Sequence, residues 1–317
     1  MKIIDLGRPE KSTAVALGIF DGIHLGHRAV LKKALEQKEY APAVFTFSGM
    51  EQKHGEPLLK IIPESQKFLM LDRMGFEYLY SPRFTDFCDM SAEDFCKDIL
   101  AGKLNAGIVV CGENFVFGRN AKGNTDTLKK YGKTYGFGVI VISPVEYDGQ
   151  VVSSTRIRKA ITDGNMKLAK ELLGCEYSVE REVISGNRIG RTIDFPTANQ
   201  RLEESQIIPR FGVYSSETEI NGLIYESITN IGVKPTIDIE TPAPLAETHI
   251  LGYHGNLYGT KIRVMLKDFI RAEKKFSSVQ QLKEQIAIDI KSRYQKFRTC
   301  KKSDFINTFI KGEFQIK

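Results

Sequence analysis

The 317-residue chain contains no tryptophan, only five cysteines and no long hydrophobic run. The cysteines are odd in number, scattered and never arranged as Cys-x-x-Cys, so neither a disulfide framework nor a zinc site is indicated. No run approaches the roughly 20 apolar residues that span a bilayer. The first residues also lack the apolar core and cleavage site of a secretory signal. We therefore expect a cytoplasmic protein with reduced thiols and no membrane partner.

The composition is that of a globular protein, with 42% hydrophobic and 26% charged residues. The length exceeds what one ordinary hydrophobic core accommodates, and it favours two domains. The net charge of +6 suits an anionic ligand, either a nucleotide or a nucleic acid. Charge alone does not distinguish these ligands.

Short apolar runs alternate with amphipathic, helix-like segments in the first half of the chain. The runs cover residues 13–20, 41–47, 76–80, 106–112 and 137–143. Because parallel neighbours need long crossover connections, this alternation predicts an α/β domain, a doubly wound parallel sheet with helices on both faces. Two further helices are expected at residues 154–165 and 166–174, the second ending at Gly174.

The pattern changes in the second half. Segments rich in β-branched and aromatic residues, separated by turn residues, cover residues 211–220, 222–232, 245–253 and 258–270. They predict an antiparallel barrel or sandwich, and helical spacing at residues 277–297 predicts a C-terminal helix against it. We place the first domain at residues 1–181 and the second at 182–317.

The stretch GIFDGIHLGH, residues 18–27, follows the first predicted strand. Ligands of doubly wound sheets lie at this edge, where free N–H groups of a helix start favour phosphate. Gly22 and Gly26 let the backbone approach a phosphate, and His24 and His27 can donate hydrogen bonds to its oxygens. The alternative is a tight turn with two surface histidines.

A second stretch, VVSSTRIRKAI at residues 151–161, follows the fifth predicted strand. Ser154 or Thr155 is the expected N-cap, and Arg156 and Arg158 bring guanidinium groups near the helix start. Alone, the stretch could be a capped helix with solvated arginines. Two anion-binding helix starts on the first and last crossovers of one sheet predict a shared cleft for a nucleoside triphosphate.

These two motifs, together with CGENFVFG at residues 111–118, resemble the FMN adenylyltransferase domain of prokaryotic FAD synthetases, a nucleotidylyltransferase domain. The resemblance implies transfer of AMP from ATP to FMN with release of pyrophosphate. It implies ligand contacts from Phe20, Gly22, His24, Gly26, His27, Asn114, Ser154, Thr155 and Arg158, with the two histidines as catalytic residues. The loop TFSGMEQKHGEP departs from the family's Thr-Phe-x-Pro-His-Pro, so no flavin contacts are assigned there.

The second half resembles the riboflavin kinase domain of the same bifunctional enzymes. The elements GNRIGRTIDFPTAN, FGVY, TNIGVKPT and AETHILGYHGNLYGTKIRV follow in the family's order. The resemblance implies a β-barrel in which Gly190, Thr197 and Asn199 bind the nucleotide, the latter two also holding Mg²⁺. It makes Glu247 the catalytic base, and a carboxylate can accept the proton of the attacking ribityl hydroxyl. Each element also has an ordinary alternative as a turn or a surface strand.

Several departures from the family lie in this second half. Asp194 stands where the family has glycine, Cys175 and Glu176 replace an Arg-Pro pair, Arg181 replaces a glycine and Gly252 replaces an aspartate. A carboxylate at position 194 would repel ATP. Two alternatives follow: an FMN adenylyltransferase whose kinase is impaired, and a fully bifunctional enzyme that also phosphorylates riboflavin.

Two other hypotheses remain open. A nucleotidylyltransferase acting on a different phosphorylated acceptor would fit the first domain alone, although the barrel favours FMN. A flavin- or RNA-binding regulator is disfavoured because the chain lacks the interleaved aromatic and basic residues of single-strand RNA binders. We therefore expect ATP and FMN, with riboflavin as a further candidate, to be the substrates and expect no nucleic-acid partner.

Overall fold

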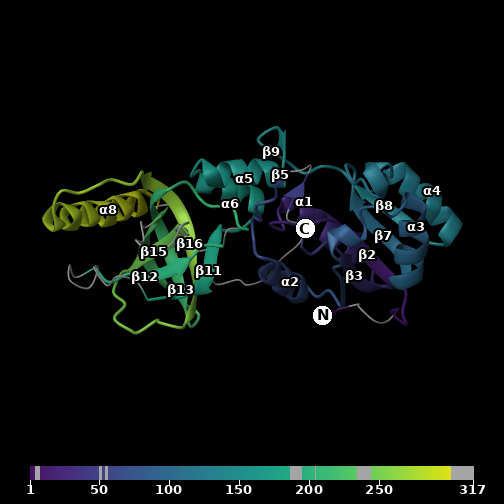
Figure 1. Cartoon of the computed structure of the whole chain (residues 1–317), viewed down its shortest axis with the longest axis horizontal. Coiled ribbons are helices and arrows are strands. Elements are labelled where there is room, and N and C mark those ends of the chain that lie inside the picture. The colour runs from purple at the N-terminus through teal and green to yellow at the C-terminus, as the bar shows by residue number, and fades with distance from the viewer. Residues whose placement is uncertain are drawn as a thin grey trace. The chain divides into compact units, whose positions relative to one another are not determined.

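The computed structural model describes residues 1–3, 8–49, 52–53, 56–185, 195–203, 205–233 and 244–300 (Figure 1). The chain forms two compact units. The first comprises Met1–Ala160, Leu168–Cys175 and Glu204–Ile207, and the second comprises Ile161–Lys167, Glu176–Glu203 and Ile208–Lys317. Segments from both sides of residue 182 thus contribute to each unit. The domain boundary between residues 181 and 182 stays a prediction.

The first unit is built on a parallel sheet with the strand order β1-β6-β3-β2-β7-β8. Its strands are β1 (Lys2–Ile3), β2 (Thr13–Leu17), β3 (Ala41–Phe45), β6 (Tyr78–Tyr80), β7 (Ala106–Gly112) and β8 (Gly138–Ile142). The five predicted runs therefore form the predicted parallel sheet, with β1 added at one edge. From β2 the chain builds outward to β3 and β6 on one side and to β7 and β8 on the other.

Four helical segments pack on the two faces of this sheet: α1 (Leu25–Leu35) and α2 (Glu64–Arg73) on one, and α3 (Ala92–Asp94), with its π-helical continuation η2 (Phe95–Lys103), and α4 (Thr125–Tyr135) on the other. Two further helices, α5 (Ser154–Thr162) and α6 (Met166–Leu173), follow the last strand of the sheet in the chain. Successive residues of β2 point to opposite faces. Accordingly Ala16 packs in the cluster that contains Leu31 of α1, whereas Val15 packs in the cluster that contains Leu128 of α4. Gly174, at φ 72°, ends α6 in the left-handed conformation expected of it.

Short elements connect these larger ones. They are β4 (Gln52–Lys53), β5 (Glu56–Pro57), β9 (Glu146–Tyr147), β10 (Gln150–Val151), η1 (Phe84–Asp86) and η3 (Arg119–Ala121). The strands pair as two antiparallel hairpins, β4 with β5 and β9 with β10. In the part of the chain described here, no helix has both the length and the apolar surface needed to cross a membrane.

The second unit is a nearly closed antiparallel barrel with the strand order β11-β16-β13-β14-β15-β12. Its strands are β11 (Ser178–Glu182), β12 (Ala198–Arg201), β13 (Gly212–Ile220), β14 (Leu223–Val233), β15 (Pro244–Ile250) and β16 (Lys261–Arg271). The two outer strands meet where the Ile184 N–H donates to the Asn199 carbonyl at 2.8 Å. The Gln200 amide reinforces this seam by donating to the carbonyls of Arg181 and Ile262 at 2.7 and 2.9 Å. The predicted barrel is confirmed.

The predicted C-terminal helix is also present as α8 (Val279–Cys300). Its Asp289 side chain is 3% exposed and forms a two-pronged ion pair with Arg271 of β16, with N–O distances of 2.8–3.1 Å. Arg271 matches carboxylate geometry with two parallel N–H groups. This pair fixes the helix to the barrel.

Candidate active sites

The loop between β2 and α1 lies at the carboxyl edge of the parallel sheet. The chain changes its direction of strand addition between β2 and β7, and ligands of such sheets bind in the crevice at this point. Asn114 lies just past the end of β7 and is exposed. The sequence motifs therefore occupy the two neighbouring loops that border the crevice.

His24 is the N-cap of α1. Its Nδ1 accepts a hydrogen bond from the His27 N–H at 3.3 Å, and the two imidazole rings stack with centroids 3.5 Å apart. Since Nδ1 accepts, the neutral His24 ring carries its proton on Nε2. A Cβ at Gly26 would lie 3.2 Å from Cε1 of His24, so the glycine leaves room for this ring.

Burial keeps both imidazoles neutral. Burial and the nearby Arg158 charge lower the pKa of His24 to about 4. Burial, His24 and Lys67 hold the pKa of His27 well below its ordinary value. The Nδ1 atom of His27 is buried without a hydrogen-bond partner. The structure thus offers one imidazole N–H and one unpartnered ring nitrogen beside the start of α1.

The loop that carries these histidines has an uncommon backbone. Phe20 and Ile23 adopt positive φ values of 53° and 40°, and Gly22 has a φ of 83°. Phe20 is 1% exposed, and its ring meets that of His27 edge-on at 5.4 Å. The structure therefore places Phe20 in the core beneath His27. A Cβ at Gly22 would meet Ile61 at 3.1 Å.

The start of α5 lies directly against this loop. The Ser153 hydroxyl accepts the Arg156 N–H at 3.3 Å, so Ser153 is the N-cap, and the prediction of Ser154 or Thr155 was wrong by one or two residues. Ser154 is thereby free to donate from Oγ to the Asp21 carbonyl at 3.2 Å. This bond joins the first residue of α5 to the loop that leads into α1, and the cleft expected between the two helix starts stays a prediction. Thr155 is exposed in the first turn.

The two arginines of α5 bind protein groups. Arg158 pairs with the Asp21 carboxylate and donates from Nε to the Leu59 carbonyl at 2.7 Å. Arg156 donates to the carbonyls of Tyr147 and Gln150 at 2.9 and 3.0 Å. Burial raises the pKa of Asp21, while the Arg158 charge acts in the opposite direction. Sequence reasoning missed Asp21 because an acidic residue beside an anion site carries no anion-binding signal.

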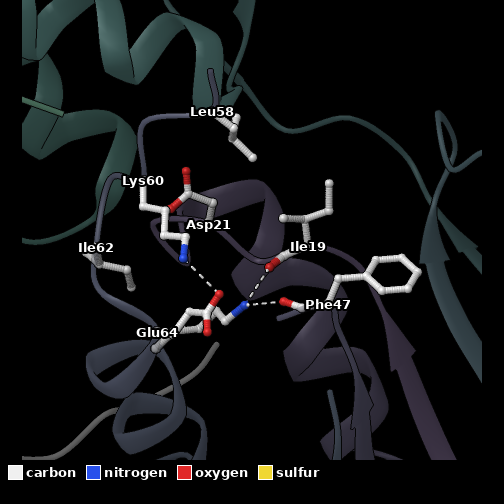
Figure 2. A pocket seen from close by; sticks show the side chains of 8 residues that line it. Ile19, Asp21, Phe47, Leu58, Lys60, Ile62 and Glu64 are labelled. Atoms are coloured by element: carbon white, nitrogen blue, oxygen red, sulfur yellow. Dashed lines mark hydrogen bonds and ion pairs between the residues drawn. The ribbon is translucent and has the colours of Figure 1, made fainter. Parts of the chain in front are cut away.

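A pocket borders the same loop (Figure 2). It is lined by Ile19, Asp21, Phe47, Leu58, Lys60, Ile62, Glu64 and Lys67. The Lys67 ammonium is buried and donates to Thr46 Oγ1 at 3.1 Å and to the carbonyls of Ile19 and Phe47 at 3.3 Å. Burial lowers the pKa of Lys67 to about 8. Sequence reasoning missed this lysine, because within α2 it resembles any polar residue of an amphipathic helix.

The barrel brings three predicted kinase residues together. Asn199 of β12 pairs directly with Glu247 of β15, which in turn pairs with Asn230 of β14. Thr197 precedes Asn199 by two residues, and the Asn199 amide donates to the Thr197 carbonyl at 3.4 Å. The Oδ1 atom of Asn199 is buried without a partner. Gly190, which is predicted to bind the nucleotide, and Asp194, the departure from the family's glycine, lie outside the described residues.

The other departures from the family have local partners or fit the local backbone. Arg181 pairs with Glu203 at 2.9 Å, and Glu176 pairs with Lys267 at 2.8 Å. Cys175 accepts a weak hydrogen bond from Arg28 at 3.8 Å. Gly252, at φ 71°, occupies a turn conformation that favours glycine.

Comparison with known proteins finds matches to both halves of the chain. The FAD synthetase family model matches residues 7–156, and the riboflavin kinase model matches residues 173–297. The bifunctional riboflavin kinase/FMN adenylyltransferase of Bacillus subtilis (strain 168) is 34% identical, covering 95% of this chain and 100% of that protein. The Escherichia coli (strain K12) protein of that name is 33% identical, covering 89% and 91%.

A solved structure also matches most of the chain. It is a crystal structure of a Streptococcus pneumoniae protein named "Macrolide-efflux Protein", with a TM-score of 0.78 and 34% identity, and it covers 90% of this chain and 95% of that one. The chain therefore belongs to the FAD synthetase family of bifunctional riboflavin kinase/FMN adenylyltransferases.

Proposed function

We propose that the first unit transfers AMP from ATP to FMN, forming FAD and pyrophosphate. The observation that carries this proposal is the hydrogen bond from Ser154, the first residue of α5, to the Asp21 carbonyl in the loop that leads into α1 at the carboxyl edge of the sheet. Two sets of free backbone N–H groups then converge on one polyphosphate. The enzyme would act in the cytoplasm on small molecules, without a nucleic-acid partner.

The reaction needs no nucleophile from the protein. An oxygen of the FMN phosphate attacks the α-phosphorus of ATP, the bond to the bridging oxygen breaks, and pyrophosphate leaves with that electron pair. His24 donates from Nε2 to a phosphate oxygen, and Gly26 and His27 border the same anion. Ser154 and Thr155 contact the phosphates from the α5 side, and Asn114 holds substrate across the crevice. Positioning and charge stabilisation lower the barrier.

We further propose that the barrel phosphorylates riboflavin. The direct pairing of Asn199 with Glu247 supports this, as does the local accommodation of Arg181 and Glu176. The Glu247 carboxylate would accept the proton of the ribityl hydroxyl while its oxygen attacks the γ-phosphorus of ATP, with ADP as the leaving group.

Mg²⁺ fits the donor atoms beside Glu247. The described residues include no cluster of three or more His, Cys, Asp or Glu side chains suited to a metal. The unpartnered Oδ1 of Asn199 is a neutral oxygen of the kind that Mg²⁺ accepts together with substrate phosphates. We propose that Thr197 and Asn199 hold the ion, which would neutralise phosphate charge when bound.

A paired assay tests both proposals. The purified chain is incubated with ATP and Mg²⁺, and with either FMN or riboflavin, and the flavins are separated by chromatography. FAD from both flavins supports a bifunctional enzyme, and FAD from FMN alone leaves only the adenylyltransferase. No FAD from FMN would refute the adenylyltransferase. If riboflavin is not used, Asp194→Gly tests whether the carboxylate is the cause.

A further inference from the structure

A single buried carboxylate, Asp21, joins three segments of the first unit. Its Oδ1 accepts the Ile61 N–H at 2.9 Å, and its Oδ2 accepts the guanidinium of Arg158. Its backbone carbonyl accepts the Ser154 hydroxyl at 3.2 Å. The residue is 7% exposed. The loop before α1, the start of α5 and the segment at Ile61 therefore meet at one residue.

The loop needs such an anchor because of its backbone. Phe20, immediately before Asp21, and Ile23, two residues after it, have positive φ values of 53° and 40°. Such conformations are costly for residues with a Cβ and persist only where the surroundings fix them. Asp21 lies between the two and accepts hydrogen bonds with both its side-chain carboxylate and its backbone carbonyl.

Arg158 completes the arrangement from the other helix. Its guanidinium bridges the Asp21 carboxylate and the Leu59 carbonyl. Since Ser154 and Arg158 both belong to α5, this helix is held to the histidine loop at two points one turn apart. The spacing of the two helix starts consequently depends on Asp21.

We propose that Asp21, with Arg158 as its partner, is a positioning residue for adenylyl transfer. The inference rests on the proposed function of the first unit. The pair sets the separation and orientation of the two groups of N–H donors that flank the polyphosphate. In-line displacement is sensitive to misplacement by about 1 Å, which can cost about 100-fold in rate. Loss of the pair should therefore lower kcat more than it raises the KM for FMN.

Asp21→Asn is the direct test, because an asparagine can still accept the Ile61 N–H through its one oxygen but has neither the charge for an ion pair nor a second oxygen for the Arg158 guanidinium. We expect kcat for FAD formation from FMN and ATP to fall at least tenfold, with less than a threefold change in the KM for FMN. Arg158→Lys should likewise lower kcat much more than it changes the KM for FMN. Because the two residues act as one unit, the double variant should be no slower than the slower single variant.

Asp289→Asn is the matched control. Asp289 is also a buried carboxylate paired with an arginine, but it lies in the second unit. The Asp289→Asn variant should have a lower melting temperature and an unchanged kcat for adenylyl transfer. If D21N does not fold, R158K decides the question.

Three results would overturn the proposal while the parent enzyme makes FAD: a parent-like kcat in a folded D21N or R158K, equal losses of kcat and of FMN affinity, or the same loss in D289N. If the fold-loss of kcat in the double variant equals the product of the two single-variant losses, Asp21 and Arg158 do not act as one unit. A parent enzyme that makes no FAD from FMN would instead refute the proposed function itself, and the positioning role with it.

Discussion

The imidazole of His24 makes the stability of the first unit depend on pH. Its pKa is lowered from 6.5 to about 4, so the folded chain binds fewer protons than the unfolded chain between these values. The free energy of unfolding must then rise with pH across that window. At pH 5 this contribution amounts to a loss of about 2 kcal/mol relative to pH 7.

Urea unfolding at pH 5 and pH 7 measures this effect. The raised pKa of Asp21 acts in the opposite direction, so the comparison that isolates His24 is between the parent and His24→Gln. We expect the variant to lose less stability on acidification than the parent. Equal losses would show that His24 does not titrate as its burial implies.

The variant Gly26→Ala tests whether the position of the His24 ring affects catalysis independently of the stability of the fold. Within a helix this change ordinarily stabilises by about 0.5–1 kcal/mol. Here the new methyl group would press on the His24 ring, so we expect at least a tenfold fall in the kcat of FAD formation without a lower melting temperature. Lys33→Ala, at an exposed position of the same helix, serves as the control. Full activity of Gly26→Ala would show that the ring position is not critical.

Among the elements, the seam between β11 and β12 depends on Gln200. Its amide satisfies the carbonyls of Arg181 and Ile262. Gln200→Leu leaves both carbonyls without this donor, and we expect a loss of about 2–4 kcal/mol in the unfolding of the barrel. Denaturant unfolding measures this loss, with Gln280→Leu at an exposed position of α8 as the control. An unchanged midpoint would mean that the backbone bond at Ile184 closes the barrel unaided.

The elements were predictable where the signal is local. Alternating apolar runs predicted the parallel sheet, and the motif positions indicated that α5 begins beside the loop that leads into α1. The sequence did not reveal that Arg158 binds Asp21 or that Lys67 reaches three oxygens of the loops after β2 and β3, because such partners come from separate elements. Pairing of Asn199 with Glu247 likewise depends on strand register, which a motif does not specify.

For the whole molecule, the two proposed activities should be separable by mutation. His24→Asn should lower FAD formation from FMN at least 100-fold while riboflavin is still converted to FMN. Glu247→Gln should do the reverse, because an amide cannot accept the ribityl proton. Chromatography of both reactions with both variants measures this. Loss of both activities in either variant would indicate one shared site.

The first unit also includes a short segment from much later in the sequence, Glu204–Ile207. Lys60 exchanges backbone hydrogen bonds with Ser205 and Ile207, at 2.7 and 2.8 Å, and its neighbours Leu59 and Ile61 hold Arg158 and Asp21. Residues that follow β12 in the chain thus hold in place the segment that binds Arg158 and Asp21, beside the proposed site of AMP transfer. A fragment that ends at residue 181 would lack Ser205 and Ile207, and its adenylyltransferase site would lose their support. Splitting the enzyme into two separate proteins would therefore require other residues to support the Lys60 segment.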